Sequence, residues 1–142
     1  MKRILVALDA SDRASTVLNA AVRLAELTAA KLVLFRAITV PLDVPSELFA
    51  VTDVRLEDIL KRNAHEQLSR LASRLPDGMV EQITTEIAAP WEGICRAGKS
   101  HDADLIMIGS HGFGGIDRLL GTTAAKVVNH SDLNVFVVRT LL

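Results

Sequence analysis

Apolar residues along the chain fall into two alternating patterns, and together they predict the secondary structure. Short continuous apolar runs are typical of strands buried on both faces, and apolar residues three or four positions apart are typical of helices that bury one side. The runs predict five strands, at Ile4–Leu8, Lys31–Ile38, Val80–Ile87, Leu105–Ile108 and Asn134–Arg139. The spaced pattern predicts helices over residues 14–25, 56–75, 90–101 and 123–130.

A helical segment stands between each predicted strand and the next, so each strand would reach the following one through a crossover. Crossovers of this kind produce a parallel sheet covered by helices on both faces, which is the α/β class. Residues 39–51, which include Pro41 and Pro45, are predicted to form an irregular crossing loop. Since no repeat or linker interrupts the pattern, residues 1–142 are predicted to form a single domain.

The composition of the chain argues against several classes of binding partner. With 16 Lys and Arg against 17 Asp and Glu, the chain has no basic field that would favour nucleic acid or an acidic membrane, and its few aromatic residues offer little for base stacking. No apolar stretch is long enough to cross a bilayer, and the first apolar run is too short for a signal peptide. Cys95 is the single cysteine, which fits a reducing compartment. We therefore expect a cytoplasmic protein with neither a nucleic-acid nor a membrane partner.

The stretch that follows Leu105–Ile108 carries the clearest candidate chemistry. The apolar run stops at Gly109, three more glycines follow within six residues, and Gly121-Thr122-Thr123 opens the last predicted helix. Glycines let backbone N–H groups approach a phosphate closely, and a helix N-terminus adds unpaired donors and a partial positive charge. The pattern predicts an anion-binding loop, with a plain turn as the alternative.

Asp9 follows the first predicted strand at the carboxyl edge of the sheet, where ligands of open α/β sheets bind. Its carboxylate could hydrogen-bond a ribose or a base, or help to hold a metal-bound phosphate. The alternative is that Asp9 or Ser11 caps the first helix. Thr122 and Thr123 present the same choice between phosphate contact and helix capping. The four histidines lack the spacing of a metal site, so no metal ligands are predicted.

A second glycine pattern matches a phosphate-binding motif by sequence but lacks the structural context that the motif requires. Residues Gly93–Ser100 match the P-loop pattern G-x-x-x-x-G-K-[ST]. A P-loop follows a strand and opens a helix, whereas these residues continue a helical pattern and lead into the strand at Leu105. We interpret them as a helix C-terminus with a favourable Lys99, and a phosphotransferase that uses Lys99 is a minor alternative. No set of nucleophile, base and acid is evident, so no catalysis beyond slow hydrolysis by positioning is predicted.

The last predicted strand is apolar on both faces at Val135–Val138, although it follows the final helix. A bare sheet edge of this kind invites pairing with another strand. We hypothesise that Asn134–Arg139 pairs with its copy in a second chain, which would produce a homodimer.

Three segments, ILVALDASDRAS, ADLIMIGSHGFGGIDRLLGTTAAKVV and NVFVVR, together resemble the universal stress protein family over essentially the whole chain. The resemblance implies a Rossmann-like open five-stranded parallel sheet of order 3-2-1-4-5 with helices on both faces. It also implies frequent dimers through the last strand and a cytoplasmic role under stress or growth arrest. The ATP-binding branch of the family carries G-x2-G-x9-G-[ST]. Here Gly109, Gly112 and Gly121-Thr122 match, but eight residues separate Gly112 from Gly121, one fewer than in that pattern.

The matching positions imply a site for ATP, with or without Mg²⁺, or for AMP or ADP. By this resemblance the base and ribose would meet Ala7, Leu8, Asp9 and the backbone of Ala37. The phosphates would meet Gly109, Ser110, His111, Gly112, Gly121, Thr122 and Thr123. The implied function is a nucleotide-binding regulatory module of the stress response with an unidentified client protein, not an efficient enzyme. The alternative is an interaction module that binds no nucleotide because its glycine loop is shortened.

Overall fold

The computed structural model describes residues 1–40, 56–111 and 120–140. Strands and helices alternate along these residues, and each strand is followed by a helix on the way to the next. The elements are β1 (Arg3–Ala7), α1 (Ala14–Thr28), β2 (Lys31–Ile38), α3 (Leu56–Ala72), β3 (Val80–Ile87), α4 (Pro90–Ser100), β4 (Leu105–Gly109), α5 (Thr122–His130) and β5 (Asn134–Val138).

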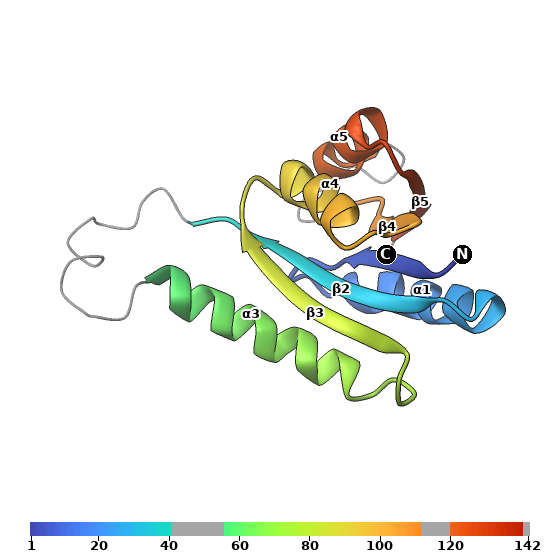
Figure 1. The fold of residues 1–142 in the computed structure, drawn as a ribbon. Coiled ribbons are helices and arrows are strands. Elements are labelled where there is room, and N and C mark those ends of the chain that lie inside the picture. Colours follow the sequence, from blue (N-terminus) through green and yellow to red (C-terminus); the bar gives the residue numbers. More distant parts are fainter. Residues whose placement is uncertain (41–55, 112–119, 141–142) are drawn as a thin grey trace.

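The strands form one five-stranded sheet in the order β3-β2-β1-β4-β5, and all neighbouring pairs are parallel. The open parallel sheet expected from the sequence is therefore confirmed, and so is its order. Figure 1 shows α1 and α3 on one side of the sheet and α4 and α5 on the other. The first two crossovers, through α1 and α3, thus lie on one face and carry the chain outward from β1 to β2 and β3. The next two, through α4 and α5, lie on the opposite face and carry the chain back past β1 to β4 and β5. This reversal makes β1 and β4 the centre of the sheet, where the two halves of the chain meet.

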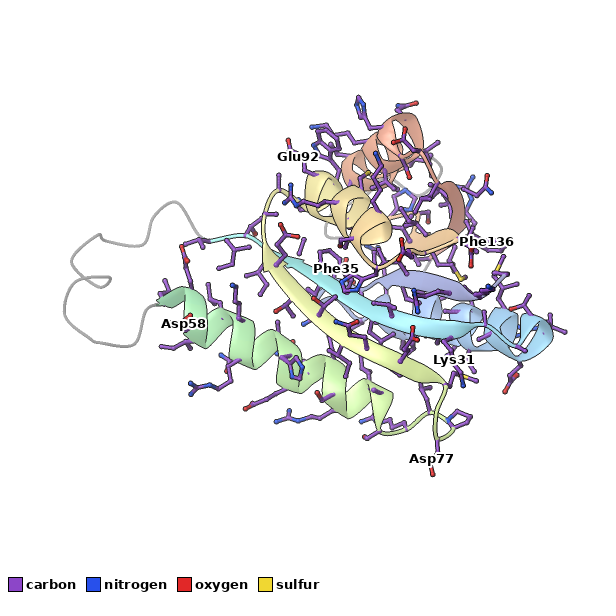
Figure 2. All side chains as sticks on the ribbon, in the orientation of Figure 1. Lys31, Phe35, Asp58, Asp77, Glu92 and Phe136 are labelled. Atoms are coloured by element: carbon purple, nitrogen blue, oxygen red, sulfur yellow. The ribbon has the colours of Figure 1, made fainter. Side chains whose placement is uncertain are left out.

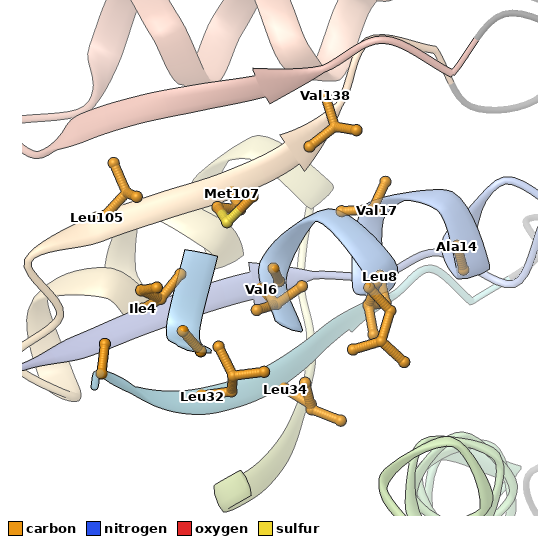
Figure 3. Packing of buried hydrophobic residues seen from close by; sticks show 14 of the residues in the cluster. Ile4, Val6, Leu8, Ala14, Val17, Leu32, Leu34, Leu105, Met107 and Val138 are labelled. Carbon is orange, nitrogen blue, oxygen red and sulfur yellow. The ribbon is translucent and has the colours of Figure 1, made fainter. Parts of the chain in front are cut away.

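Alternate residues of the central strands supply two hydrophobic cores, one on each face, because successive side chains of a strand point to opposite sides. Figure 3 shows the core under α1, to which β1 contributes Ile4 and Val6, β2 contributes Leu32 and Leu34, and β4 contributes Leu105 and Met107. Leu5, Val33, Phe35 and Ile106 from the intervening positions pack with α4 and α5. The continuous apolar runs in the sequence therefore reflect burial on both faces of the sheet.

Several predicted boundaries are wrong by one to three residues. The first strand ends at Ala7, so Leu8 lies just beyond it, and the last strand ends at Val138, so Arg139 lies outside it. The second long helix ends at Ala72 and not at residue 75, because the backbone N–H of Leu75 donates to Ala72 in a tighter turn before Pro76. Most of the loop predicted over residues 39–51 lies outside the described residues.

Polar contacts bind the strands together at the amino-terminal edge of the sheet. The Asp104 carboxylate accepts hydrogen bonds from the backbone N–H groups of Lys2 (2.7 Å) and Arg3 (2.9 Å). The Arg3 guanidinium pairs with Glu81 of β3 and donates to the His101 carbonyl at 2.7 Å. These groups are exposed or half-buried, so this edge of the sheet is hydrogen-bonded and faces solvent.

Leu68 attaches α3 to the sheet and offers a direct test of this packing. Its side chain is fully buried, so Leu68→Ala should lower the free energy of unfolding by about 2–5 kcal/mol, through lost burial and the cavity left behind. Urea denaturation measures the change. Leu27→Ala in α1 is the matched control, because Leu27 is 84% exposed and its loss should cost less than about 0.5 kcal/mol. Equal losses in the two variants would contradict the packing described here.

Candidate functional site

A cleft of about 850 Å³ opens at the carboxyl edge of the sheet. Its floor consists of the ends of β1, β2 and β4, and its walls come from the first residues of α1, α4 and α5 and from the N-terminal half of α3. In open parallel sheets ligands bind beside the strand ends where the order of connections reverses. The cleft lies at that position, since the connections reverse between β1 and β4 and the ends of both strands line the cleft.

The cleft brings together nearly all of the site residues expected from the sequence. Its lining includes Ala7, Leu8, Asp9, Ala37, Gly109, Ser110, His111, Gly121, Thr122 and Thr123. Gly112 lies outside the residues that the structure describes. Segments more than one hundred residues apart in the chain therefore converge on one cavity.

Asp9 lies in a turn between β1 and α1. Its Oδ1 accepts hydrogen bonds from the backbone N–H of Ser11 (2.9 Å) and from the Ser11 hydroxyl (2.6 Å). The N-cap residue of α1 is Arg13, which makes no side-chain capping bond. The alternative that Asp9 or Ser11 caps this helix is therefore wrong, because two further residues separate Ser11 from the first helical turn. The exposed Asp9 carboxylate is instead fixed at the rim of the cleft.

The N-terminus of α5 points into the same cleft. Gly121 is its N-cap residue and makes no side-chain cap, so the expectation that Thr122 or Thr123 caps the helix is also wrong. The first backbone N–H groups of a helix have no acceptor inside the helix, and together with the helix dipole they favour an anion. Gly121 to Ala124 all line the cleft. This end of the cavity can therefore accept negative charge.

A buried polar cluster holds the start of the glycine loop, and it consists of Ser110, His111 and Thr140. The Ser110 hydroxyl accepts a bond from the backbone N–H of Thr140 (3.0 Å) and lies 3.1 Å from His111 Nδ1. The Thr140 hydroxyl accepts from the His111 backbone N–H at 3.2 Å. The Ser110 carbonyl accepts from the Gly121 N–H at 2.7 Å. The two ends of the glycine loop are thus bonded to each other, and its first end is also bonded to Thr140 after β5.

His111 is almost completely buried in this cluster. Its Nδ1 faces Ser110, whereas its Nε2 has no hydrogen-bond partner among the described residues. A buried polar atom without a partner is uncommon in folded proteins and calls for an explanation such as a ligand or water.

Gly109 has a packing role that its place in the loop motif did not indicate. A Cβ atom at this position would lie 3.0 Å from a methyl group of Val17 and 3.2 Å from the methyl group of Thr140. Glycine therefore allows α1 and the residues after β5 to close on the end of β4. The same explanation applies to Gly98, where a Cβ would lie 2.9 Å from Leu133.

Sequence reasoning missed part of the lining because its signals are weak. Phe35, Pro90, Ile94 and Ile108 are ordinary apolar residues in the sequence, yet they form apolar walls of the cleft. Asn63 and Gln67 belong to α3, Arg13 precedes α1, and none of the three is part of a motif. Arg36 interrupts the apolar run of β2, and a charge at such a position is a signal that could mark a site residue.

The P-loop alternative is wrong, because Gly93–Ser100 lies entirely inside α4. The helix runs from Pro90 to Ser100, within one residue of the range predicted from the sequence. Lys99 forms an exposed ion pair with Asp132, away from the cleft. Within the described ranges, no three His, Cys, Asp or Glu side chains gather as they would around a metal ion. None of the described helices is long and apolar enough to span a membrane.

An open parallel sheet with a ligand cleft at the reversal of strand order defines the class of doubly wound α/β proteins. Within that class, the model of the universal stress protein family matches residues 1–139. The chain belongs to the universal stress protein family.

Individual relatives agree with this assignment. The chain is similar to the universal stress protein Sll1388 of Synechocystis, with 27% identity over 96% of this chain and 97% of the relative. Among solved structures it is similar to UspA from Lactobacillus plantarum, with 25% identity, 97% of both chains covered and a TM-score of 0.75.

Two further structures of similar fold contain ligands. One is a universal stress protein in complex with cAMP, with 22% identity over 98% of this chain and 97% of that one and a TM-score of 0.69. The other is the universal stress protein from Archaeoglobus fulgidus in complex with dAMP, with 23% identity over 97% of this chain and 98% of that one and a TM-score of 0.65.

Thr140 tests whether the polar cluster stabilises this end of the sheet. Thr140→Val keeps the shape of the side chain and removes its hydroxyl, so the buried N–H of His111 loses its acceptor. We expect the free energy of unfolding to fall by about 1–3 kcal/mol in urea denaturation. Thr16→Val, at an exposed position of α1, is the matched control and should change stability little. A Thr140→Val variant as stable as the wild type would show that the cluster contributes nothing.

Proposed function

We propose that this universal stress protein binds ATP or a related adenine nucleotide in the cleft and acts as a nucleotide-responsive regulatory module. The observation that carries the proposal is the convergence of Asp9, Ala37, the start of the glycine loop and the N-terminus of α5 on one cavity at the reversal of strand order. The cAMP and dAMP complexes of the two structural neighbours support an adenine nucleotide as the ligand class.

The lining of the cleft combines the kinds of chemistry that a nucleotide requires. Ala7 and Ala37 are small and lie beside the apolar Phe35, Ile94 and Ile108, which suits a planar base. The Asp9 carboxylate at the rim suits ribose hydroxyl groups. The first residues of α5 line the same cleft, and the backbone N–H groups of its first turn suit phosphates.

The shortened glycine loop is compatible with this proposal. The Gly121 N–H donates to the Ser110 carbonyl at 2.7 Å, so the two ends of the loop are adjacent despite the missing residue. The N-terminus of α5 lines the cleft in this arrangement.

We propose a binding role, not an efficient enzyme, because the hydroxyl and imidazole of Ser110 and His111 are buried, and the Ser110 hydroxyl already accepts a hydrogen bond from the Thr140 N–H. We further propose that residues 1–142 act as one domain in the cytoplasm, where the single Cys95 would stay reduced. The nucleotide would then bias the interaction with an unidentified client protein. An interaction module that binds no nucleotide is the competing function.

Calorimetric titration with ATP tests the proposed function. Wild-type protein should bind, and Gly121→Val should not, because the branched side chain would place bulk at the N-terminus of α5 where the phosphates lie. Lys99→Ala is the matched control, and it should bind like the wild type because Lys99 pairs with Asp132 outside the cleft. The absence of heat with the wild-type protein at millimolar ATP and magnesium would favour the competing function.

A second proposal concerns the edge strand β5, which we expect to pair with its copy in a homodimer. Phe136 on this strand is 48% exposed and points away from the sheet in Figure 2. Exposed apolar side chains on an unpaired edge favour strand association. Light scattering at micromolar concentration should therefore report a mass near twice 15.4 kDa, and Phe136→Lys should shift it toward the monomer. A monomeric wild-type mass would contradict the dimer.

A further inference from the structure

Arg36 is a buried charge at the edge of the cleft. It lies in β2 between Phe35 and Ala37, and its side chain is directed to the face that carries α1 and α3. Only 7% of the residue is exposed. A buried guanidinium is unfavourable unless its N–H groups are hydrogen-bonded, so the partners of Arg36 indicate why the charge is tolerated there.

The guanidinium makes three hydrogen bonds to the described residues, and two of them hold the backbone that follows β1. Nε donates to the Leu8 carbonyl at 3.0 Å, and Nη2 donates to the Asp9 carbonyl at 2.9 Å. Nη1 donates to the Gln67 side chain of α3 at 2.5 Å. Burial lowers the pKa of Arg36, and the nearby Asp9 carboxylate opposes that shift. Since the guanidinium of arginine ordinarily titrates far above neutral pH, the side chain stays charged there.

The Arg36 contacts occur where the sheet no longer supports the chain. The Leu8 N–H still donates to the Phe35 carbonyl at 2.9 Å, but β1 itself has ended at Ala7. Beyond this point the Arg36 guanidinium holds the chain, because it donates to the carbonyls of two consecutive residues, Leu8 and Asp9. Ser11 fixes the Asp9 carboxylate from the other side. Both the backbone and the side chain of Asp9 are therefore held in place.

We infer that Arg36 is a positioning residue for ribose recognition: it holds the Leu8 and Asp9 carbonyls so that the Asp9 carboxylate faces the ribose hydroxyl groups of a nucleotide in the cleft. The inference rests on the proposed function and names the part of the nucleotide whose recognition depends on Arg36. Arg36 itself need not touch the ligand. Its fork geometry matters, because a lysine has one ammonium group and cannot hold two carbonyls in the same way.

A merely structural role would predict a different result. If Arg36 only stabilised the fold, its replacement would weaken the binding of every nucleotide in the same proportion. If it positions Asp9, its replacement would weaken ATP more than analogues that lack a ribose hydroxyl. The ratio of the affinities for ATP and for 2′-deoxy-ATP or 3′-deoxy-ATP therefore separates the two roles.

The experiment is a calorimetric titration of full-length protein with ATP and with the two deoxy analogues. Wild-type protein should bind ATP roughly tenfold more tightly than at least one analogue, the value expected for a lost hydrogen bond to a charged group. Arg36→Met and Arg36→Lys should both bring that ratio close to one. Arg96→Met is the matched control, because Arg96 pairs with Glu86 on the surface outside the cleft, and it should keep the wild-type ratio.

Asp9→Asn keeps the test decisive if the Arg36 variants fail to fold. Asp9 is exposed, so this variant should fold, and it should also lose the preference for the ribose hydroxyl. An unchanged ratio in Arg36→Met, or in Asp9→Asn when the Arg36 variants do not fold, would overturn the inference and leave the proposed function intact. A wild-type protein that binds neither ATP nor its analogues would overturn both.

Discussion

The structure depends on how the backbone is hydrogen-bonded where the central strands end. Within the central strands β2, β1 and β4 the N–H and C=O groups pair with the strands on either side, and at the carboxyl edge that pairing stops. The buried polar residues of the described chain, Arg36, Ser110, His111 and Thr140, all lie at this edge. Arg36 holds the chain after β1, and the other three hold the chain after β4. These buried polar side chains gather at one edge of the sheet, and their hydrogen bonds give the cleft a defined shape.

The two edges of the sheet consequently have different roles. At the amino-terminal edge, Arg3, Glu81 and Asp104 join the strands through contacts that water can reach. Such contacts contribute little each to stability. At the carboxyl edge the helices α1 and α5 begin on opposite faces of the sheet, so their first turns stand apart on either side of the strand ends. The cleft is thus a consequence of topology, and the side chains decide what it can bind.

Much of this arrangement could be predicted from the sequence. Continuous apolar runs identified the central strands because those strands are buried on both faces. The positions of Asp9 and of the glycine loop identified the carboxyl edge because residues that follow parallel strands must meet there. The strand order came from the family resemblance, since the periodicity of the runs does not say which strands are neighbours. The same local reasoning separated the cleft from Gly93–Ser100, which matches a P-loop by letter and forms part of a helix.

Other features could not be predicted because they depend on contacts between distant residues. Thr140 carries no motif, and its role follows from its meeting Ser110, thirty positions earlier. Gln67 is one polar residue among many on α3 until its contact with Arg36 is seen. Capping assignments at Ser11 and Thr122 were wrong for a related reason: residue type favours a cap, but the path of the chain into the helix decides which residue occupies it.

The central claim is that an adenine nucleotide binds at the carboxyl edge of the sheet, and backbone amide NMR during an ATP titration tests it most directly. The account predicts saturable chemical-shift changes concentrated at Asp9, Ala37, Ser110 and Gly121, with little change at Lys2, Arg3 and Asp104 on the opposite edge. Shifts confined to the opposite edge, or none at all with millimolar ATP and magnesium, would contradict it.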